Sequence, residues 1–437
     1  MRLLIVSYYF PPAAGGGVQR VLKFARYLPE FGVEVDVLTP DDPRWLDSDG
    51  GLDVPEGTTV HRSKYYGPPP GKPRDIMHGR TGVDRVMTRL KLQPRRVLLP
   101  DLHAGWALSA VPAGKRIVRD RNIDVVMSTS PPETDHVIGR RVSKATGIPW
   151  IADMRDSWLN EPGLRTDLRS VRGKLAINRR ISARTVGKAD LVLTVSDPIS
   201  DEIRGLYPDV RVQTLMNAVD LDDFRILPDV SVDSERFVIT YTGNFFGRRS
   251  PRPFLEAVDR LLQRRPELTD TLVVRFIGSL KEGDGSWIDG NERLSRVVER
   301  IAFMPYAEAL AHQRSSDMLY LAIASGDRHQ GEVTGKLFEY LGARRPILAV
   351  VPPDGAAAKL VRELDAGVIV SPDAPADIER VLEGAIDARE RDGRAADVSQ
   401  DEAAALRISR RGRAQELAGL LGELVQTTSP DSKARAR

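Results

Sequence analysis

The chain lacks cysteine throughout its 437 residues. Disulfides, thiolate nucleophiles and cysteine-ligated zinc or iron–sulfur sites are therefore excluded. Apolar runs long enough to cross a bilayer, about 18 residues, are also missing. The first apolar run, within residues 1–6, is too short for a signal peptide and is soon followed by Pro11 and Pro12. We therefore expect a cytoplasmic protein.

An excess of either charge is also missing. The 64 Lys and Arg residues nearly balance the 61 Asp and Glu residues, for a net charge of +3, unlike the excess expected of a nucleic-acid binder. The six histidines are scattered without the spacing of metal ligands. We expect no metal and no resident cofactor, so the chemistry must use oxygen, nitrogen and backbone groups.

The length predicts two domains. Short apolar, β-branched runs alternate with helical patterns in both halves, which is typical of α/β domains with parallel sheets. We predict Rossmann-like domains at residues 1–228 and 229–400, a long helix at 401–426 and a flexible tail at 427–437. The expected strands cover residues 3–7, 33–38, 125–128, 150–152, 191–195, 212–215, 237–241, 272–277, 297–303, 318–322, 347–351 and 368–370.

Glycines 15–17 follow the first expected strand and precede an apolar helical pattern. Gly16 and Gly17 would let the backbone approach a phosphate or diphosphate at the helix N-terminus. The G-x-G-x-x-G dinucleotide pattern is not met, because Arg20 stands where its third glycine would be. The alternative is a flexible turn without a ligand.

A second glycine turn leads into a helix at residues 332–341. Thr334 and Lys336 lie near the expected helix start, where a lysine beside free amides suits a diphosphate. Glu339 lies one turn further on and suits a ribose diol, which needs a hydrogen-bond acceptor. The alternative is a capped surface helix with a Lys–Glu pair.

Carboxylates flank Arg155 directly after the expected strand 150–152, at the usual ligand edge of a parallel sheet. Asp156 or Asp153 could orient or deprotonate a hydroxyl, while the other holds the arginine; a purely structural ion-pair cluster is the alternative. His136, at the start of another helix, is a weaker catalytic candidate, since such a histidine more often packs or hydrogen-bonds.

The loop after the strand 237–241 contains Gly243, Arg248 and Arg249. The guanidinium fork matches phosphate oxygens, although paired arginines also occur on solvated loops. A further segment, residues 84–121, holds nine basic residues against three aspartates. It is either a surface for an anionic membrane or an ordinary solvated helical face. Trp106 is the one aromatic residue among these cations, whereas a surface for single-stranded nucleic acid is expected to carry several aromatic rings that stack on bases.

Together these motifs resemble the retaining glycosyltransferases of the GT-B type, family four, over nearly the whole chain. The resemblance is carried by Ser7 to Pro12 with Gly15 to Arg20, by Ser130 to Pro132 followed by Ala152 to Trp158, by Tyr241 to Gly243, and by Gly335 to Leu341 leading to Arg345 to Leu348. It implies two Rossmann-like domains with parallel sheets facing a cleft, and a C-terminal helix that crosses back to the first domain.

The resemblance also implies roles. The first domain would bind an acceptor, which is a glycan, lipid-linked or small molecule, and the second a nucleoside diphosphate sugar. Glu339 would bind the donor ribose, Met304 would lie beside the base, and Asp156 or Asp153 beside the reacting sugar. Relatives often carry an arginine directly after the equivalent of Gly243, where this chain has Asn244.

Arg248 or Arg249, with Lys336, would therefore supply charge to the diphosphate. Relatives also separate two glutamates by seven residues, whereas six lie between Glu332 and Glu339. The expected reaction is metal-independent transfer with retained configuration. A non-catalytic nucleotide- or glycan-binding protein and a sugar-nucleotide epimerase are the alternatives.

Overall fold

The computed structural model describes residues 1–13, 16–41, 53–67, 98–159, 169–245, 249–302, 304–326, 329–394 and 397–428. The chain forms two compact units: unit 1 comprises residues 1–216 and 410–437, and unit 2 comprises residues 217–409. The division lies before the boundary we predicted at residue 228. The reason is that Val219 and Phe224 pack close to Gly342 in unit 2.

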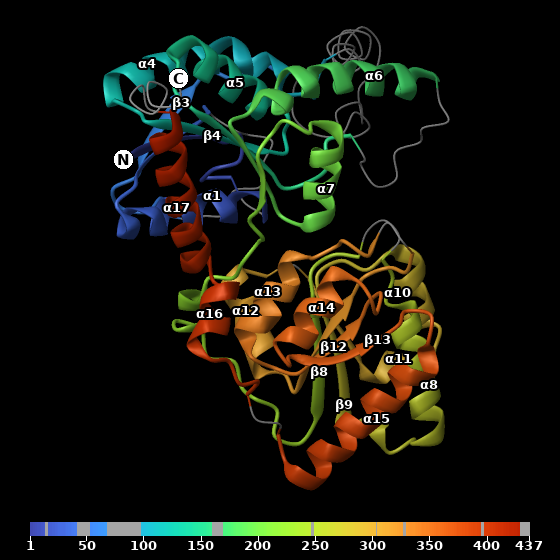
Figure 1. The fold of residues 1–437 in the computed structure, drawn as a ribbon. Helices are drawn as coiled ribbons and strands as arrows, with labels where there is room; N and C mark the ends of the chain where they lie inside the picture. The colour runs from blue at the N-terminus through green and yellow to red at the C-terminus, as the bar shows by residue number, and fades with distance from the viewer. Residues whose placement is uncertain are drawn as a thin grey trace, which may run out of the picture. The chain divides into compact units, whose positions relative to one another are not determined.

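Unit 1 is built on a sheet of seven parallel strands in the order β3-β2-β1-β4-β5-β6-β7 (Figure 1). The expected strands of this half are present, whereas β3 was not predicted. The strands are β1 (Arg2–Val6), β2 (Glu34–Pro40), β3 (Thr59–Ser63), β4 (Val125–Ser130), β5 (Trp150–Met154), β6 (Leu191–Thr194) and β7 (Val212–Thr214).

Helices cover both faces of this sheet because alternate strand residues point to opposite sides. Leu3 and Ile5 pack into one core, with helices α1 (Gly16–Tyr27) and α17 (Arg410–Thr428). Leu4 and Val6 pack into the other core. The helices on that second face are α4 (Ala107–Arg121), α5 (Thr134–Thr146), α6 (Arg169–Arg184) and α7 (Asp197–Leu206), with the 3-10 turns η3 (Ala104–Trp106) and η4 (Val186–Lys188).

Unit 2 repeats the architecture with six parallel strands in the order β10-β9-β8-β11-β12-β13. Its strands are β8 (Phe237–Thr242), β9 (Leu272–Ile277), β10 (Val298–Ile301), β11 (Met318–Ala322), β12 (Ile347–Val350) and β13 (Gly367–Val370). Its helices are α8 (Arg252–Arg264), α9 (Leu268–Thr271), α10 (Glu282–Asp289), α11 (Glu292–Val297), α12 (Tyr306–Ser315), α13 (Gly335–Ala343), α14 (Ala356–Glu363), α15 (Pro375–Asp392) and α16 (Glu402–Ile408).

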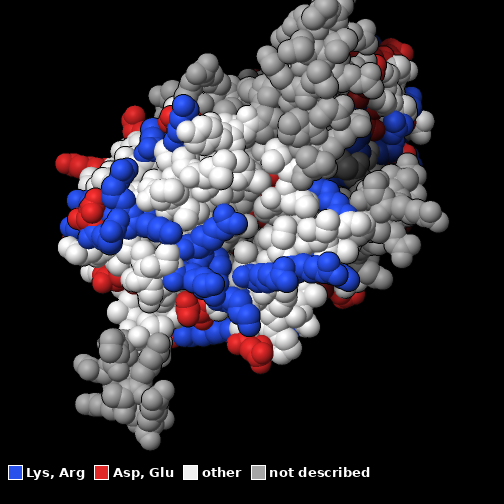
Figure 2. Space-filling model, turned by 90° about the horizontal axis from the view of Figure 1, so that it is seen from above, with Lys and Arg blue, Asp and Glu red and all other residues white. Residues whose placement is uncertain are grey.

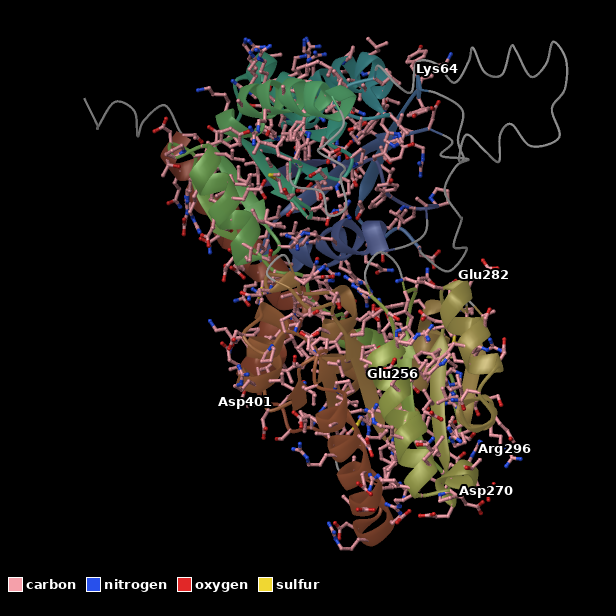
Figure 3. All side chains as sticks on the ribbon, turned by 90° about the vertical axis from the view of Figure 1, so that its right-hand side faces the viewer. Lys64, Glu256, Asp270, Glu282, Arg296 and Asp401 are labelled. Carbon is pink, nitrogen blue, oxygen red and sulfur yellow. The ribbon has the colours of Figure 1, made fainter. Side chains whose placement is uncertain are left out.

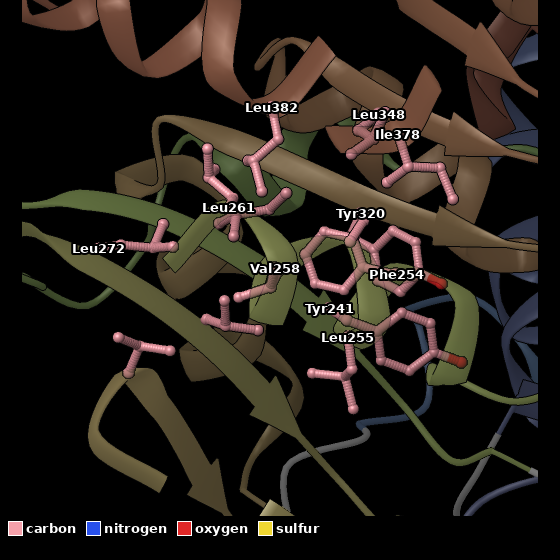
Figure 4. Close-up of a cluster of buried hydrophobic side chains, with 14 of the residues drawn as sticks. Tyr241, Phe254, Leu255, Val258, Leu261, Leu272, Tyr320, Leu348, Ile378 and Leu382 are labelled. Carbon is pink, nitrogen blue, oxygen red and sulfur yellow. The ribbon is translucent and has the colours of Figure 1, made fainter. Parts of the chain in front are cut away.

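The core of unit 2 shows why this half folds around α8 (Figure 4). Phe254, Val258 and Leu261 recur at helical spacing and are fully buried, so one face of the helix lies on the sheet. Phe254 also stacks on Tyr320 of β11, with ring centroids 4.3 Å apart. Such offset aromatic pairs add to the energy of burial.

The C-terminal segment is two helices instead of the single one we predicted at 401–426. Ser409 separates α16 from α17 because its backbone is extended and bridges Val219. α17 belongs to unit 1, where Leu417 and Leu421 are buried in the core that includes α1. Among the described helices, none is both long and apolar enough to cross a membrane.

Candidate active site

In each sheet the strand order reverses between two neighbours, β1 and β4 in unit 1 and β8 and β11 in unit 2. Ligands of open α/β sheets bind beyond the carboxyl ends of the strands at such reversal points. Apart from Asp153 in β5, the described site residues that we predicted lie in the loops after β5, β8, β10 and β11 or in the first two turns of α1, α5 and α13.

In unit 2, the glycine that follows β8 makes room for a lysine. Gly243 has φ +102°, and a Cβ there would lie 2.5 Å from the Cε of Lys336 and 3.0 Å from its Nζ. Gly278, after β9, lies close to the backbone of Gly243, because a Cβ added to Gly278 would lie 2.6 Å from the Gly243 carbonyl oxygen. Gly278 is therefore required by close approach to backbone as well as by its φ of +122°, whereas Gly243 is required by its φ of +102°, since the end of the lysine side chain can shift.

Lys336 lies in the first turn of α13 with its Nζ 5.2 Å from the Tyr241 ring centroid. Burial, together with the nearby Arg249, lowers the pKa of Lys336 from 10.5 to about 8, while Glu339 acts in the opposite direction. Within the described ranges Lys336 forms no ion pair. The amine is thus a partly buried donor at a helix N-terminus, which favours an anion.

The carboxylate of Glu339 is oriented by a buried amide. Gln313 of α12, fully buried, donates from Nε2 to the Oε2 of Glu339 at 3.3 Å and to the Oγ1 of Thr242 at 3.0 Å. Thr242 is the last residue of β8, and its backbone N–H donates to the Tyr340 hydroxyl at 3.0 Å. These bonds tie α12 and α13 to the end of β8 and fix Glu339 one turn beyond Lys336.

Two buried polar atoms beside these residues have no hydrogen-bond partner among the described residues: the Oγ1 of Thr334 and the Oε1 of Gln313. Thr334 is the N-cap of α13, yet its hydroxyl does not cap the helix. Because buried polar atoms are normally satisfied, an unpaired hydroxyl at the N-terminus of α13 and an unpaired amide oxygen on the residue that holds Glu339 are consistent with a site that a polar ligand completes.

Arg249 lies in the loop after β8 and is paired with Glu332, which also contacts the Nδ1 of His329 at 3.0 Å. Burial lowers the pKa of Arg249. Glu332 therefore holds this arginine. Arg248 lies outside the described residues. Met304 is half-buried between β10 and α12, on the same strand-end edge of the sheet.

In unit 1, Arg155 joins the loops that follow β1, β4 and β5. Its guanidinium donates to the carbonyl oxygens of Gly17 at 2.6 Å, Ser130 at 2.9 Å and Pro131 at 2.8 Å. Gly17 is confined, because a Cβ there would lie 3.4 Å from an Arg155 nitrogen and from the Tyr9 ring. Gly16 begins α1, so the predicted order of strand, glycines and helix holds.

Asp153 is fully buried and is held by an arginine that the sequence did not associate with it. Arg20 of α1 donates to both Asp153 carboxylate oxygens, with a shortest distance of 2.7 Å, and Thr129 donates at 2.8 Å. Burial alone would raise the pKa of Asp153, but the Arg20 guanidinium lowers it below its ordinary value. This environment is at odds with direct action on a substrate and makes Asp153 a positioning residue.

His136 is also fully buried, in α5. Its Nδ1 is 2.8 Å from the Ser128 hydroxyl, which also accepts a hydrogen bond from the Trp150 indole at 2.8 Å. Burial lowers the pKa of His136 to about 3, so the ring is neutral. The packing alternative accounts for this placement, and the structure gives His136 no exposed edge for catalysis.

Asp156, by contrast, is exposed at the start of the loop after β5, next to Arg155 in sequence. It is therefore the predicted carboxylate of unit 1 that a ligand can reach. Nearby, Asp135 accepts from the Tyr8 backbone N–H at 2.8 Å, and burial raises its pKa well above the ordinary value. Asp135 thus belongs to the support of this edge.

Sequence reasoning missed Gln313 and Arg20. Each had a signal, since both are polar residues on helix faces whose neighbours are buried, and a buried polar side chain needs a partner. Within the described residues no group of three His, Asp or Glu side chains could hold a metal ion.

Residues 15–218 match the family model of the glycosyl transferase 4-like domain. No curated protein sequence matches the chain. Among solved structures, a glycosyltransferase from Rickettsia africae aligns with TM-score 0.63 at 12% identity over 97% of this chain and 98% of its own. Sucrose-phosphate synthase from Thermosynechococcus elongatus gives 0.55 at 15% identity over 98% of both chains.

Anabaena HepE, in complex with UDP-glucose, aligns with TM-score 0.54 at 12% identity over 99% of this chain and 100% of its own. At these identities the structural likeness concerns the fold, and the fold that these proteins share with this chain is the two-sheet GT-B arrangement.

Proposed function

We propose that this chain, whose residues 15–218 match a glycosyl transferase 4-like domain and whose two sheets have the GT-B fold, is a glycosyltransferase that transfers a sugar from a nucleoside diphosphate sugar to an acceptor hydroxyl. The donor half-site is the strand-end edge of unit 2, and the groups that act on the acceptor come from unit 1. That Anabaena HepE was determined with UDP-glucose agrees with a donor of this class.

One observation carries the proposal. Lys336 is a partly buried cation without an ion-pair partner among the described residues, and it lies at the α13 N-terminus beside the unsatisfied Thr334 hydroxyl. Such a site favours an anion, because a lysine charge, the N-terminal amides of α13 and a hydroxyl all belong to residues 334–336. The Glu339 carboxylate, one turn deeper, is a hydrogen-bond acceptor suited to the ribose hydroxyls.

The chemistry then follows from charge. The bond between the anomeric carbon and the diphosphate oxygen breaks, and a bond from that carbon to the acceptor oxygen forms. Lys336, Arg249 and the helix N-terminus stabilise the negative charge that develops on the diphosphate. The departing phosphate takes the acceptor proton as the new bond forms on the same face, so the configuration is retained. Because the chain itself supplies these cations, we propose that the reaction needs no metal ion.

On the acceptor side we assign Asp156 to orienting the hydroxyl, since it is the exposed carboxylate of the β5 loop. We assign the N-terminal amides of α1, which begins at Gly16 and Gly17, to a phosphate of the acceptor or donor. We propose a glycan or a lipid-linked molecule as the acceptor, used at the inner, anionic face of a membrane.

The test is release of nucleoside diphosphate from a panel of sugar nucleotides by the purified protein. Lys336→Ala and Glu339→Ala are compared with Lys359→Ala and Glu292→Ala, whose side chains are 75% and 86% exposed. Turnover should be lost in the first pair and kept in the second. Near-normal turnover in both members of the first pair, while they remain folded, would show that the donor half-site is wrongly assigned.

The same assay separates a glycosyltransferase from a nucleotide-binding protein and from an epimerase, and it tests metal dependence. A protein that only binds nucleotides would release no diphosphate above background, and an epimerase would convert the donor sugar without an acceptor. Excess chelator should leave the rate unchanged; a rate abolished by chelator and restored by magnesium would contradict metal independence.

A further inference from the structure

Three helices of unit 1 that lie on one face of its sheet are rich in cations and poor in carboxylates. Helices α4, α5 and α6 together contain thirteen Lys and Arg residues and two aspartates. One of those aspartates, Asp135, is fully buried, so it does not offset charge at the surface. Helix α6 has no acidic residue at all. The sequence pointed only to the α4 part of this set.

The cations of this face are available at the surface. Arg116 and Arg119 of α4, Arg141 and Lys144 of α5, and four cations of α6 are exposed; those of α6 are Lys174, Arg179, Arg180 and Arg184. None of these eight side chains takes part in an ion pair within the part of the chain that the structure describes. Figure 2 shows Lys and Arg side chains gathered on this face, viewed from above.

The helices bring the cations next to one another. Lys115 and Arg119 of α4 line a shallow hollow together with Ala145 and Thr146 of α5, directly after Lys144. The turn η4, which follows α6, contacts α5 in turn. Figure 1 shows α4, α5 and α6 along the same side of unit 1. The exposed cations of these helices therefore lie along the same side of unit 1, which we call the α4–α6 face.

In unit 2, by contrast, the surface arginines that end helix α8 are held in ion pairs. Arg260 and Arg264 of α8 pair with Glu379 of α15, at 3.0 and 2.8 Å. Arg265 pairs with Asp387 at 2.5 Å. The arginines of α8 are thus neutralised, whereas the eight exposed cations of α4, α5 and α6 form no ion pair among the described residues.

Apolar side chains are exposed on the same helices. Leu108 of α4 is 72% exposed and Ile177 of α6 is 43% exposed. Beside the start of α4, the Ser109 hydroxyl contacts the Lys64 carbonyl oxygen, and the Lys64 amine lies over the exposed ring of Tyr66. Figure 3 shows Lys64 at the upper end of unit 1, where α4 to α6 lie in Figure 1.

We infer that the α4–α6 face docks this protein on an anionic lipid bilayer. Unpaired Lys and Arg attract anionic headgroups, and exposed Leu, Ile and Tyr side chains enter the interfacial region. The inference deepens the proposed function, because a lipid-linked acceptor lies in such a bilayer. A nucleic acid fits less well, since single strands are held by several stacking aromatic rings and Tyr66 is the exposed one near these cations.

The experiment measures co-sedimentation of the full chain with vesicles of phosphatidylcholine alone and of phosphatidylcholine mixed with phosphatidylglycerol. The test variant removes four charges from the face with Arg141→Gln, Lys144→Gln, Arg179→Gln and Arg180→Gln. The control removes four exposed charges from unit 2 with Arg225→Gln, Arg296→Gln, Lys359→Gln and Arg380→Gln. Figure 3 shows Arg296 at the outer surface of unit 2.

At low salt, the wild type and the control should bind the vesicles that contain phosphatidylglycerol and should not bind the vesicles of phosphatidylcholine alone. This binding should be lost as the salt concentration rises. The test variant should need at least tenfold more anionic lipid for the same binding. Leu108→Ser with Ile177→Ser should weaken vesicle binding and leave binding to heparin unchanged. The inference would be overturned if the wild type did not co-sediment with anionic vesicles, or if the test variant bound them as well as the control does.

Donor turnover without lipid is measured on the same variants. Vesicle binding by a wild type that turns over no sugar nucleotide supports the docking face and overturns the transferase proposal. Turnover of a sugar nucleotide by a wild type that does not bind vesicles supports the transferase proposal and overturns the docking face. Binding to a single-stranded oligonucleotide with none to vesicles would identify the face as a nucleic-acid surface and overturn the docking inference.

Discussion

Replacing Lys336 by methionine should stabilise unit 2 while it abolishes donor turnover. Methionine keeps most of the apolar length of the side chain and removes the charge. Burial lowers the pKa of this amine from 10.5 to about 8. Because a change of one in a pKa is worth about 1.4 kcal/mol, holding the charge in the folded protein costs up to about 3 kcal/mol.

Two effects reduce that figure. Lys336 retains some contact with solvent, and its Nζ lies over the Tyr241 ring at 5.2 Å, an attraction worth about 1 kcal/mol. We therefore expect Lys336→Met to raise the free energy of unfolding by about 1–2 kcal/mol near neutral pH. For a unit of this size each kcal/mol shifts the melting temperature by about 2–4 °C.

The stability difference between Lys336→Met and the wild type should depend on pH. The folded pKa lies below the unfolded one, so the unfolded chain binds the proton more tightly and stability rises as pH increases from about 8 to 10.5. Below pH 8 the full cost is present, and near pH 10.5 it disappears. The stability advantage of Lys336→Met, measured by urea unfolding, should therefore be largest near neutrality and shrink toward alkaline pH.

Turnover should change in the opposite direction. Removing one preorganised electrostatic donor typically costs about 100- to 1000-fold in rate, so kcat/KM for the sugar nucleotide should fall by that order. In the wild type, kcat/KM should fall as pH rises through about 8, and Lys336→Arg should move that decline to higher pH. A Lys336→Met protein that is less stable at neutral pH, or equally stable but still active, would refute this account of the amine.

Three further predictions concern other parts of the site. Gly243→Ala should lower the free energy of unfolding by about 1–3 kcal/mol in thermal denaturation, because φ is +102° and the new Cβ would lie 2.5 Å from a lysine Cε, whereas Gly283→Ala, with open space around it, should not. Asp156→Asn should reduce kcat for transfer at least tenfold without altering the melting temperature, since its side chain is exposed; unchanged kcat would remove it from the mechanism. Arg20→Met should cost about 3–5 kcal/mol in urea unfolding by leaving Asp153 as an unpaired buried charge, and adding Asp153→Leu should recover part of it.

Most of the strands could be predicted because buried parallel strands are nearly continuous apolar runs. The strand β3 was missed because its sequence, Thr-Val-His-Arg-Ser, is polar at an outer position of the sheet. The break at Ser409 was missed because the apolar spacing continues across it, and only the long-range bridge to Val219 shows the interruption.

The site was predictable where a general rule of the fold applies. Strand-end loops of a parallel sheet share one edge, so Gly243 and Lys336 could be associated although 93 positions separate them, and the structure places them in contact. The partner of Asp153 was not predictable, because Arg20 is 133 positions away and local spacing favoured Arg155. The amide of Gln313 was hidden for the same reason.

The proposed function requires that unit 2 binds a nucleoside diphosphate between Lys336 and Glu339. The most direct measurement is calorimetric titration of the purified protein with a panel of nucleoside diphosphates, repeated on Lys336→Met, Glu339→Gln and the acceptor-side variant Asp156→Asn. The account predicts that one diphosphate binds the wild type and Asp156→Asn with the same Kd and binds the other two variants at least tenfold more weakly. Equal affinity in all four proteins, or no binding of any diphosphate, would contradict it.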